Sequence, residues 1–183
     1  MTKILRYLVQ TTLLLSLATG LAIAQGETDS SMAVTPKGET ELYNEIDWIL
    51  YDTGLVAAKN DEKHVLINFT TSWCGWCKKM EKETFSKPDV IKLVADNFVA
   101  IKVDGDSKKE LNIDGFKITE KNLAKREYGV RGYPSFCFLN SEGTKLGCFS
   151  GYRDKKTMIQ YLNYIKNGDY DTTQTQSPEK GSK

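Results

Sequence analysis

Short apolar runs alternate with charged amphipathic stretches along the middle of the chain. Residues 64–70 and 98–103 are apolar and rich in β-branched and aromatic side chains, which is typical of buried strands. Between them, residues 78–85 place apolar side chains at helical spacing among charges. Residues 89–96 also carry apolar side chains at helical spacing, and they follow Pro88, a residue that suits the first turn of a helix. Strands that alternate with helices predict an α/β protein with parallel strand pairing.

The last third of the chain predicts a hairpin followed by a helix. Residues 136–139 and 145–149 are apolar runs on either side of the turn-forming sequence Asn-Ser-Glu-Gly. This arrangement predicts two antiparallel strands. Residues 154–166 begin with Asp154, a good N-cap, and carry their apolar side chains at helical spacing. We expect this final helix to close one face of the sheet.

Three other segments have weaker patterns. Residues 42–60 mix apolar residues with charges and are predicted to form a helix kinked near Gly54. Residues 104–120 are polar with isolated apolar positions, which predicts an inserted surface loop, with substrate or partner recognition as the alternative. Residues 121–128 are predicted to form a short helix.

The 183 residues are enough for one domain with extensions at both ends. We assign residues 1–24 to a signal peptide and residues 25–40 to a flexible leader, because the leader is polar and contains Gly, Ser, Thr and Pro. The domain is expected to cover residues 41–167, and residues 168–183 are expected to form a disordered tail.

The signal peptide is predicted from the order of its parts. Lys3 and Arg6 precede an apolar run at residues 8–17, and small residues at 22–24 form a cleavage pattern. A membrane span is the alternative, but polar residues interrupt the run and it is short for a bilayer. No cysteine lies at the cleavage point, which argues against a lipoprotein anchor. We therefore expect export to the periplasm, an oxidising compartment in which disulfides persist.

Net charge excludes some classes of partner. The whole chain has a formal net charge of +1, and loss of Lys3 and Arg6 with the signal peptide brings it to about −1. A nearly neutral protein is not predicted to bind nucleic acid or an anionic membrane surface.

The strongest chemical signal is Trp73-Cys74-Gly75-Trp76-Cys77, which lies where a predicted strand ends and a predicted helix begins. Unpaired backbone N–H groups and the dipole at a helix N-terminus favour a thiolate at the first cysteine. A thiolate is the nucleophile of thiol–disulfide exchange. We therefore predict that Cys74 attacks the substrate disulfide and that Cys77, one turn later, resolves the mixed disulfide that forms.

A zinc site and a purely structural disulfide are the rival interpretations of this pair. Tetrahedral zinc needs four ligands and usually a second ligand pair at similar spacing. Cys137 and Cys148 do not have that spacing, and His64 is the only histidine in the chain. We favour redox chemistry and expect neither a metal nor another cofactor.

Residues 71–90, TSWCGWCKKMEKETFSKPDV, resemble the thioredoxin superfamily. The Trp-Cys-x-x-Cys-Lys core is specific to the superfamily. The continuation Glu-Lys-x-Thr-Phe-Ser-x-Pro-x-Val is similar to an exported branch that includes the C-terminal periplasmic domain of DsbD-type thiol:disulfide interchange proteins. The resemblance covers residues 42–166. It implies a thioredoxin fold, with a central mixed sheet flanked by helices and the cysteine pair exposed at one end.

Residues 130–136, VRGYPSF, carry the second part of the resemblance. In the superfamily, a proline at this place is cis and lies against the active cysteines, and Pro134 resembles it. Such a proline would expose the backbone of Tyr133 to an extended substrate peptide, which could pair with it as an added strand. An ordinary trans turn proline is the alternative.

Two departures from the family pattern concern proton transfer. Thioredoxins have a buried aspartate on the strand before the active turn, where this chain has Asn68. A buried lysine on the next strand is also expected to be missing, because Ala100 falls near its position. An asparagine cannot accept a proton, so deprotonation of Cys77 is predicted to use water or a nearby carboxylate, Glu81 or Glu83.

Cys137 and Cys148 fall on the two arms of the predicted hairpin, on the same face. Their register depends on the turn, so they are either directly opposite or one pair apart. Three interpretations stay open: two buried free thiols, a structural cross-strand disulfide, or a second redox pair. Apolar neighbours favour the first, and export favours the second.

The resemblance and the turn together imply an exported thiol–disulfide oxidoreductase that mainly reduces substrate protein disulfides. Gly75-Trp76 adds no charge between the cysteines, so we expect a reducing to intermediate potential. A membrane thiol–disulfide partner would supply the electrons, and the protein would be a monomer. The alternatives are a disulfide oxidase or isomerase and a redox-inert peptide-binding or chaperone module.

Overall fold

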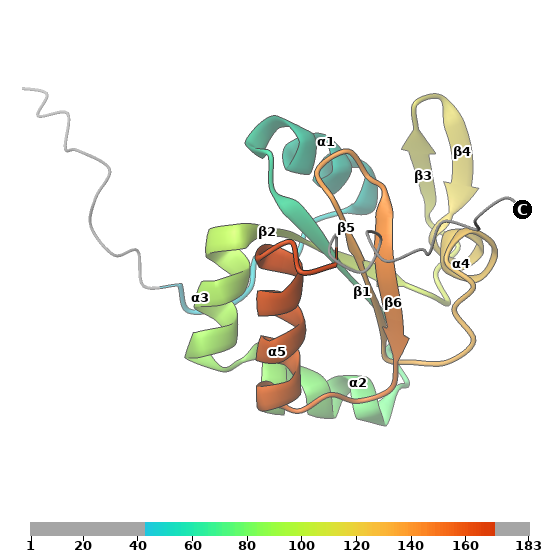
Figure 1. Cartoon of the computed structure of the whole chain (residues 1–183). Helices are drawn as coiled ribbons and strands as arrows, with labels where there is room; N and C mark the ends of the chain where they lie inside the picture. The colour runs from blue at the N-terminus through green and yellow to red at the C-terminus, as the bar shows by residue number, and fades with distance from the viewer. Residues whose placement is uncertain (1–42, 171–183) are drawn as a thin grey trace, which may run out of the picture. The chain divides into compact units, whose positions relative to one another are not determined.

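The computed structural model describes residues 43–170. The predicted signal peptide, the leader and most of the predicted tail therefore lie outside the described residues. The elements follow one another as shown in Figure 1, with η marking a π-helical segment: α1 (Tyr51–Asp61), β1 (His64–Thr70), α2 (Gly75–Met80), η1 (Glu81–Phe85), α3 (Pro88–Asn97), β2 (Phe98–Asp104), β3 (Glu110–Ile113), β4 (Phe116–Thr119), α4 (Glu120–Asn122), η2 (Leu123–Glu127), β5 (Ser135–Leu139), β6 (Lys145–Ser150) and α5 (Lys155–Lys166).

Four strands form the central sheet in the order β2-β1-β5-β6. β1 pairs in parallel with β2, while β5 runs antiparallel to both β1 and β6. This mixed sheet confirms the predicted fold class. The parallel pair holds the segment that leads into Cys74. In the described part of the chain, β6 is an edge strand that pairs only with β5.

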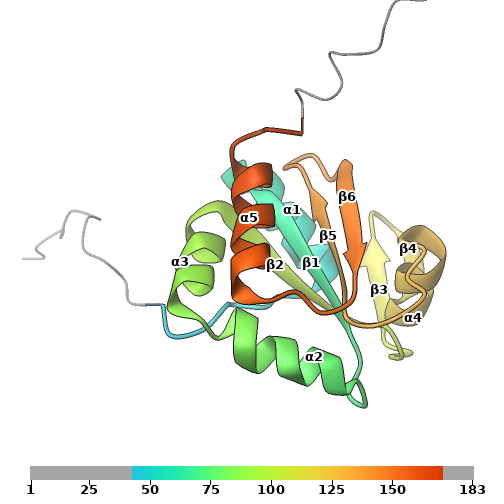
Figure 2. The same cartoon turned by 60° about the horizontal axis from the view of Figure 1, so that its bottom comes forward.

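Helices cover both faces of the sheet (Figures 1 and 2). α2, η1, α3 and α5 pack on one face around the fully buried Phe136 and Phe138. α1, the β3–β4 pair and η2 pack on the other face, around Ile67 and Phe69. Each such fully buried side chain contributes about 1.5–3 kcal/mol, so the two cores anchor the strand ends that carry the cysteine turn.

The beginning of the domain differs from the predicted kinked helix. Residues 43–50 are not helical, and α1 begins only at Tyr51. Ile49 instead forms a parallel bridge with Ile101 of β2. Gly54 lies in the first turn of α1, where a Cβ would come within 2.5 Å of the Ile101 side chain. The glycine therefore allows close packing of α1 on the sheet and does not mark a kink.

The predicted inserted loop contains a hairpin made of β3 and β4, which projects beside α4 in Figure 1. Leu111 and Ile118 face each other across it and are both buried in the core under α1. The apolar positions look isolated in the sequence because only alternate residues of a strand point inward. Phe116, at the start of β4, is exposed.

The described chain runs three residues past the predicted domain end at residue 167. The Tyr170 hydroxyl and His64 Nε2 are hydrogen-bonded at 3.0 Å, and their rings meet edge to face. This contact ties the segment after α5 to the start of β1. Within residues 43–170, no helix is both long enough and apolar enough to cross a bilayer.

Candidate active site

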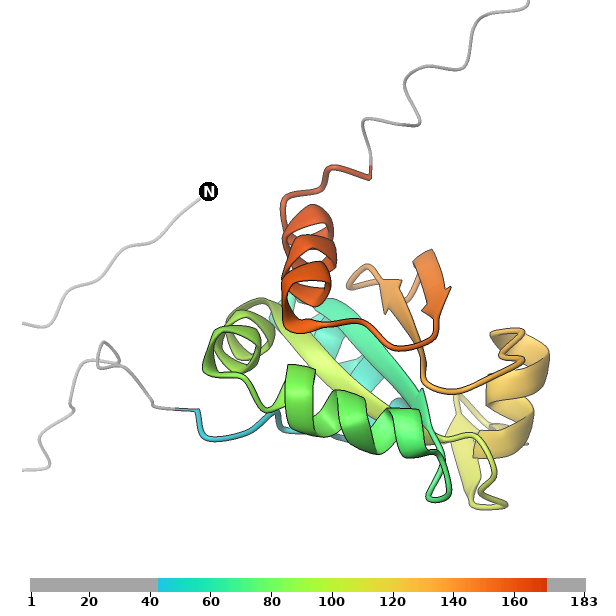
Figure 3. The ribbon, with the colours of Figure 1, turned by 90° about the horizontal axis from the view of Figure 1, so that it is seen from below.

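The cysteine turn lies at the junction predicted from the sequence, between the end of β1 and the start of α2 (Figure 3). Cys74 is the N-cap of α2, and its sulfur accepts a hydrogen bond from the Cys77 N–H at 3.1 Å. Cys74 and Cys77 are joined by a disulfide, with their Cα atoms 5.3 Å apart. The helix N-terminus therefore donates directly to the sulfur predicted to be the nucleophile.

The pair is less open to solvent than the resemblance implies. Cys74 is 5% exposed and Cys77 is 6% exposed, whereas Trp73 is 65% exposed and Trp76 is 58% exposed. The expectation of an exposed cysteine pair is therefore wrong for this oxidised state. The turn therefore presents two exposed indoles next to a buried pair of cysteines.

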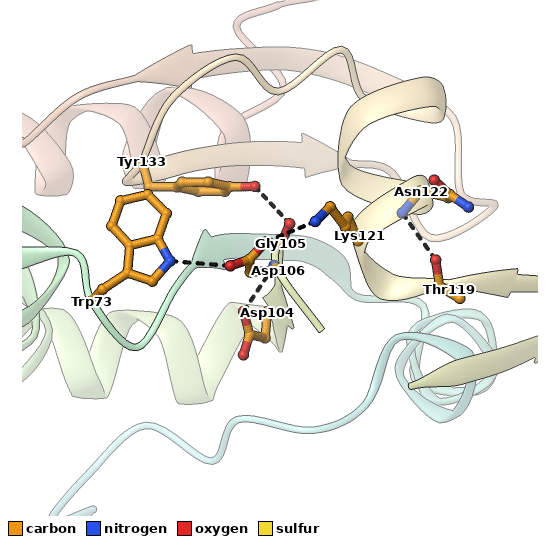
Figure 4. Close-up of polar contacts among 8 residues, drawn as sticks. All are labelled: Trp73, Asp104, Gly105, Asp106, Thr119, Lys121, Asn122 and Tyr133. Atoms are coloured by element: carbon orange, nitrogen blue, oxygen red, sulfur yellow. Dashed lines mark hydrogen bonds and ion pairs between the residues drawn. The ribbon is translucent and has the colours of Figure 1, made fainter. Parts of the chain in front are cut away.

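Trp73 is fixed by a polar network that the sequence did not reveal (Figure 4). Its indole Nε1–H donates to Asp106 at 3.2 Å, and the Lys121 ammonium donates to the same carboxylate at 3.0 Å. The Tyr133 ring meets the Trp73 ring edge to face at 6.0 Å, and its hydroxyl donates to the Gly105 carbonyl at 3.0 Å. The segment after β2 thus positions the indole beside Cys74.

Acid should release this anchor of Trp73. Hydrogen bonds from Lys121 and then from Trp73 lower the pKa of Asp106 below its ordinary value. A carboxylate with a lowered folded-state pKa contributes stability above its unfolded pKa, and loses it as pH falls through the folded value. We therefore expect the contact to persist at neutral pH and to break only below about pH 4.

Tryptophan fluorescence against pH measures this release. Asp106→Asn should remove the acid transition seen in the wild type, because the variant has no carboxylate to protonate. A transition shared by both proteins, or one near neutral pH in the wild type alone, would contradict the assignment.

Gly105 leaves room for the Tyr133 hydroxyl. A Cβ at residue 105 would overlap that hydroxyl, whereas a Cβ at Gly132 would meet nothing within 4 Å. We expect Gly105→Ala to lower the free energy of unfolding by about 1–3 kcal/mol through overpacking. Gly132→Ala, the matched control, should change it by no more than about 0.5 kcal/mol. Urea unfolding compares the two, and equal losses of stability would count against the proposed packing.

A second aromatic pair lies on the other flank of the turn. The Trp76 ring lies 5.8 Å from the Tyr152 ring, and the Lys79 ammonium lies 5.1 and 5.2 Å from the two ring centroids. The Tyr152 hydroxyl donates to Glu83 at 3.0 Å. Tyr152 was not predicted, because it comes from the segment between β6 and α5 and carries no motif.

Tyr133 and Pro134 lie at the end of the domain that carries the cysteine turn. The Tyr133–Pro134 peptide bond is cis, and the Pro134 carbonyl accepts a hydrogen bond from the Gly151 N–H at 2.7 Å. Tyr133 meets the cysteine turn through its contact with Trp73. The fold therefore brings Tyr133, from a distant part of the sequence, against the tryptophan next to Cys74.

A cleft of about 560 Å³ opens on the Cys77 side of the turn, and Glu81 and Lys102 are among the residues that line it. The strand register places Lys102 opposite Asn68, so the inference that Ala100 replaces the family lysine is wrong. Lys102 Nζ donates to Glu81 at 2.9 Å. Asn68 is buried, and its Oδ1 has no hydrogen-bond partner among the described residues.

Cys137 and Cys148 are directly opposite on β5 and β6 and are joined by a disulfide. The interpretation as buried free thiols is therefore wrong in this state. Cys137 lies in the core under α1, whereas Cys74 and Cys77 lie at the start of α2. Among residues 43–170, no group of three or more His, Cys, Asp or Glu side chains is arranged to hold a metal ion.

A family model described as thioredoxin-like domain matches residues 51–166, more than half of the chain. The chain belongs to the thioredoxin-like domain family. This thioredoxin-like chain is similar to a solved thioredoxin from Thermus thermophilus, with 26% identity and a TM-score of 0.55. That match covers 66% of this chain and 87% of the thioredoxin.

Two curated relatives indicate the branch. The thiol:disulfide interchange protein DsbD of Photorhabdus laumondii is 26% identical over 60% of this chain and 18% of that protein. The disulfide bond reductase DsbH of Chlamydia pneumoniae is 29% identical over 55% of this chain and 60% of that protein. The thioredoxin-like chain thus spans less than two thirds of the length of these relatives. The predicted DsbD-like relationship is confirmed.

Proposed function

We propose that this protein is an exported thiol–disulfide oxidoreductase that works mainly as a reductant of protein disulfides. The observation that carries the proposal is the placement of Cys74 as the N-cap of α2, with its sulfur accepting the Cys77 N–H. Donors at this place stabilise a thiolate once the disulfide is reduced. The family match and the relatives named for disulfide interchange and reduction support the same chemistry.

The reaction begins with the reduced pair. The Cys74 thiolate attacks one sulfur of a substrate disulfide, and the other substrate sulfur leaves as a thiolate and takes a proton. Cys77 then attacks the Cys74 sulfur of the mixed disulfide and releases the second substrate thiol. The substrate gains two electrons and two protons, and the protein is left with the Cys74–Cys77 disulfide seen in this structure.

The second step needs a base for Cys77. Asn68 cannot accept a proton, but Glu81 lines the cleft that Cys77 also lines. Lys102 holds the Glu81 carboxylate at the cleft through their 2.9 Å contact. We assign Glu81 the role of accepting the Cys77 proton, through water in the cleft, as that proton leaves. Glu83 accepts a hydrogen bond from Tyr152 on the other flank of the cysteine turn and does not line this cleft.

Substrates are disulfide-containing proteins that present an extended segment to Tyr133 and Pro134. The similarity of residues 130–136 to the proline segment of the superfamily supports backbone pairing at Tyr133. The sequence pattern of residues 1–24 supports export to the periplasm. There a membrane thiol–disulfide partner re-reduces the Cys74–Cys77 pair, and the protein acts as a monomer.

The direction of the reaction is tested by the reduction potential of the Cys74–Cys77 pair. Equilibration with glutathione or dithiothreitol buffers, read by alkylation and mass, should give a value between about −270 and −150 mV. A value above about −150 mV would favour the second candidate direction, disulfide oxidation or isomerisation.

A further inference from the structure

We propose that Cys137–Cys148 is a second thiol-exchange site, entered only through Cys148, and that dithiol reductants are its substrates. The exchange itself goes beyond the function of the Cys74–Cys77 pair and does not depend on it, whereas its effect on the substrate-binding end rests on the proposed function. Its starting point is the unequal placement of the two sulfurs. Cys137 is fully buried, whereas Cys148 is exposed on β6.

The edge position of β6 makes Cys148 approachable. Among the strands of residues 43–170, β6 has β5 on one side and none on the other (Figure 1). Residue Cys148 is already exposed, while its partner Cys137 lies in the apolar core with Ile67 and Tyr128. The attack therefore has one direction.

The exchange balances as a two-electron transfer. A thiolate of the dithiol attacks the Cys148 sulfur, the S–S bond breaks, and the electron pair leaves on the Cys137 sulfur, which takes up a proton. The second thiol of the reductant then attacks its own bound sulfur and releases Cys148 as a thiol. The reductant ends as a disulfide. Because Cys137 is a buried leaving group, we expect this exchange to be about tenfold slower than exchange at Cys74.

The state of this pair affects the substrate-binding end of the domain. From Cys137 and Cys148, the ladder continues through Phe136 opposite Phe149 to Ser135 opposite Ser150. The next contact is the hydrogen bond from the Gly151 N–H to the Pro134 carbonyl. The disulfide therefore clamps a two-strand ribbon that ends at the cis-proline.

The segment after that ribbon carries Tyr152 to Trp76. It runs from the end of β6 toward α5, past α2 (Figure 2). Reduction of Cys137–Cys148 removes the covalent clamp at this edge and loosens the Tyr152 flank. The rest of β6 stays attached, because Phe149 stacks on Tyr161 of α5 at 4.3 Å. The expected change is therefore local and leaves the fold intact.

The exchange is tested in Cys74→Ser/Cys77→Ser, which retains only the second pair. Under native conditions with dithiothreitol, we expect two thiols to appear, with a bulky maleimide labelling Cys148 and not Cys137. Far-UV circular dichroism should stay unchanged. The proposal is overturned if the thiols appear only at urea concentrations that unfold the chain, or if both cysteines are labelled together.

The effect on the active end is tested in Cys137→Val/Cys148→Val, which keeps apolar side chains of similar size on both strands. With Cys74 and Cys77 intact, KM for insulin should rise by about threefold while kcat changes less. An unchanged KM would overturn the link to the substrate-binding end. Activity of the wild type measured in parallel separates a failure of this proposal from a failure of the proposed function.

Discussion

Replacement of Cys74 by serine should reduce insulin-disulfide reduction to the background rate of dithiothreitol alone. The serine hydroxyl is not ionised near neutral pH, so the helix N-terminus has no thiolate to stabilise and the first attack is lost. We expect a loss of at least about 1,000-fold, in the range found when a nucleophile is removed. The assay is the turbidity of insulin chains as they precipitate.

Cys77→Ser is the matched variant, because it removes the resolving thiol and leaves the attacking one. It should also fail to turn over, but it should accumulate mixed disulfides between Cys74 and its substrates, which non-reducing gels and mass spectrometry detect. Rates in Cys74→Ser equal to those of the wild type, with both at background, would favour a redox-inert peptide-binding or chaperone module. Trapping by Cys74→Ser instead of Cys77→Ser would reverse the two roles.

Glu81→Gln should slow resolution of the mixed disulfide by about 100-fold near neutral pH, the lower end of the range for general acid–base catalysis. The amide keeps the shape of the side chain at the cleft but cannot take the Cys77 proton. Stopped-flow measurement of substrate release from a preformed mixed disulfide isolates this step. The rate of the variant should recover as pH rises and hydroxide or water replaces the carboxylate.

Glu83→Gln is the control for this prediction. Glu83 lies two residues after Glu81. It accepts a hydrogen bond from Tyr152 and does not line the Cys77 cleft. Its resolution rate should stay close to that of the wild type. If the two variants slow resolution equally, general loss of negative charge explains the effect, and the assignment of Glu81 does not hold.

The cysteine turn was predictable because its signals are local. An apolar strand, a Cys-x-x-Cys turn and an amphipathic helix are consecutive in the sequence, and the structure places Cys74 at that helix N-terminus. The hairpin of β5 and β6 and the cap of α5 by Asp154 were also predicted from adjacent residues. Mixed pairing of the sheet followed from the family resemblance and is confirmed.

The rest of the site depends on contacts between distant segments. Asp106 and Tyr152 carry no motif, and only the fold brings them to Trp73 and Trp76. Lys102 was overlooked because its position opposite Asn68 depends on the register between β1 and β2, which the sequence pattern alone does not give. The low exposure of Cys74 also depends on tertiary packing.

The bond between Cys137 and Cys148 also depends on a feature of the fold that the sequence pattern did not give, the register of the two strands. Strand parity put both side chains on one face, but a bond requires them to be directly opposite. That register depends on an irregularity at Phe138 and Leu139, beside the hairpin turn, which periodicity does not reveal. The apolar neighbours of Cys137 favoured a buried thiol, and they are equally compatible with one buried sulfur of a disulfide.

The central claim is that the N-terminus of α2 holds Cys74 as a thiolate when the pair is reduced. The rate of iodoacetamide alkylation against pH, measured on the reduced protein with residue 74 identified by mass, tests it most directly. The account predicts a titration well below about 8.5, the pKa of a free cysteine, and labelling at Cys74 before Cys77. A titration at or above that value, or no labelling of Cys74 in the folded protein, would contradict it.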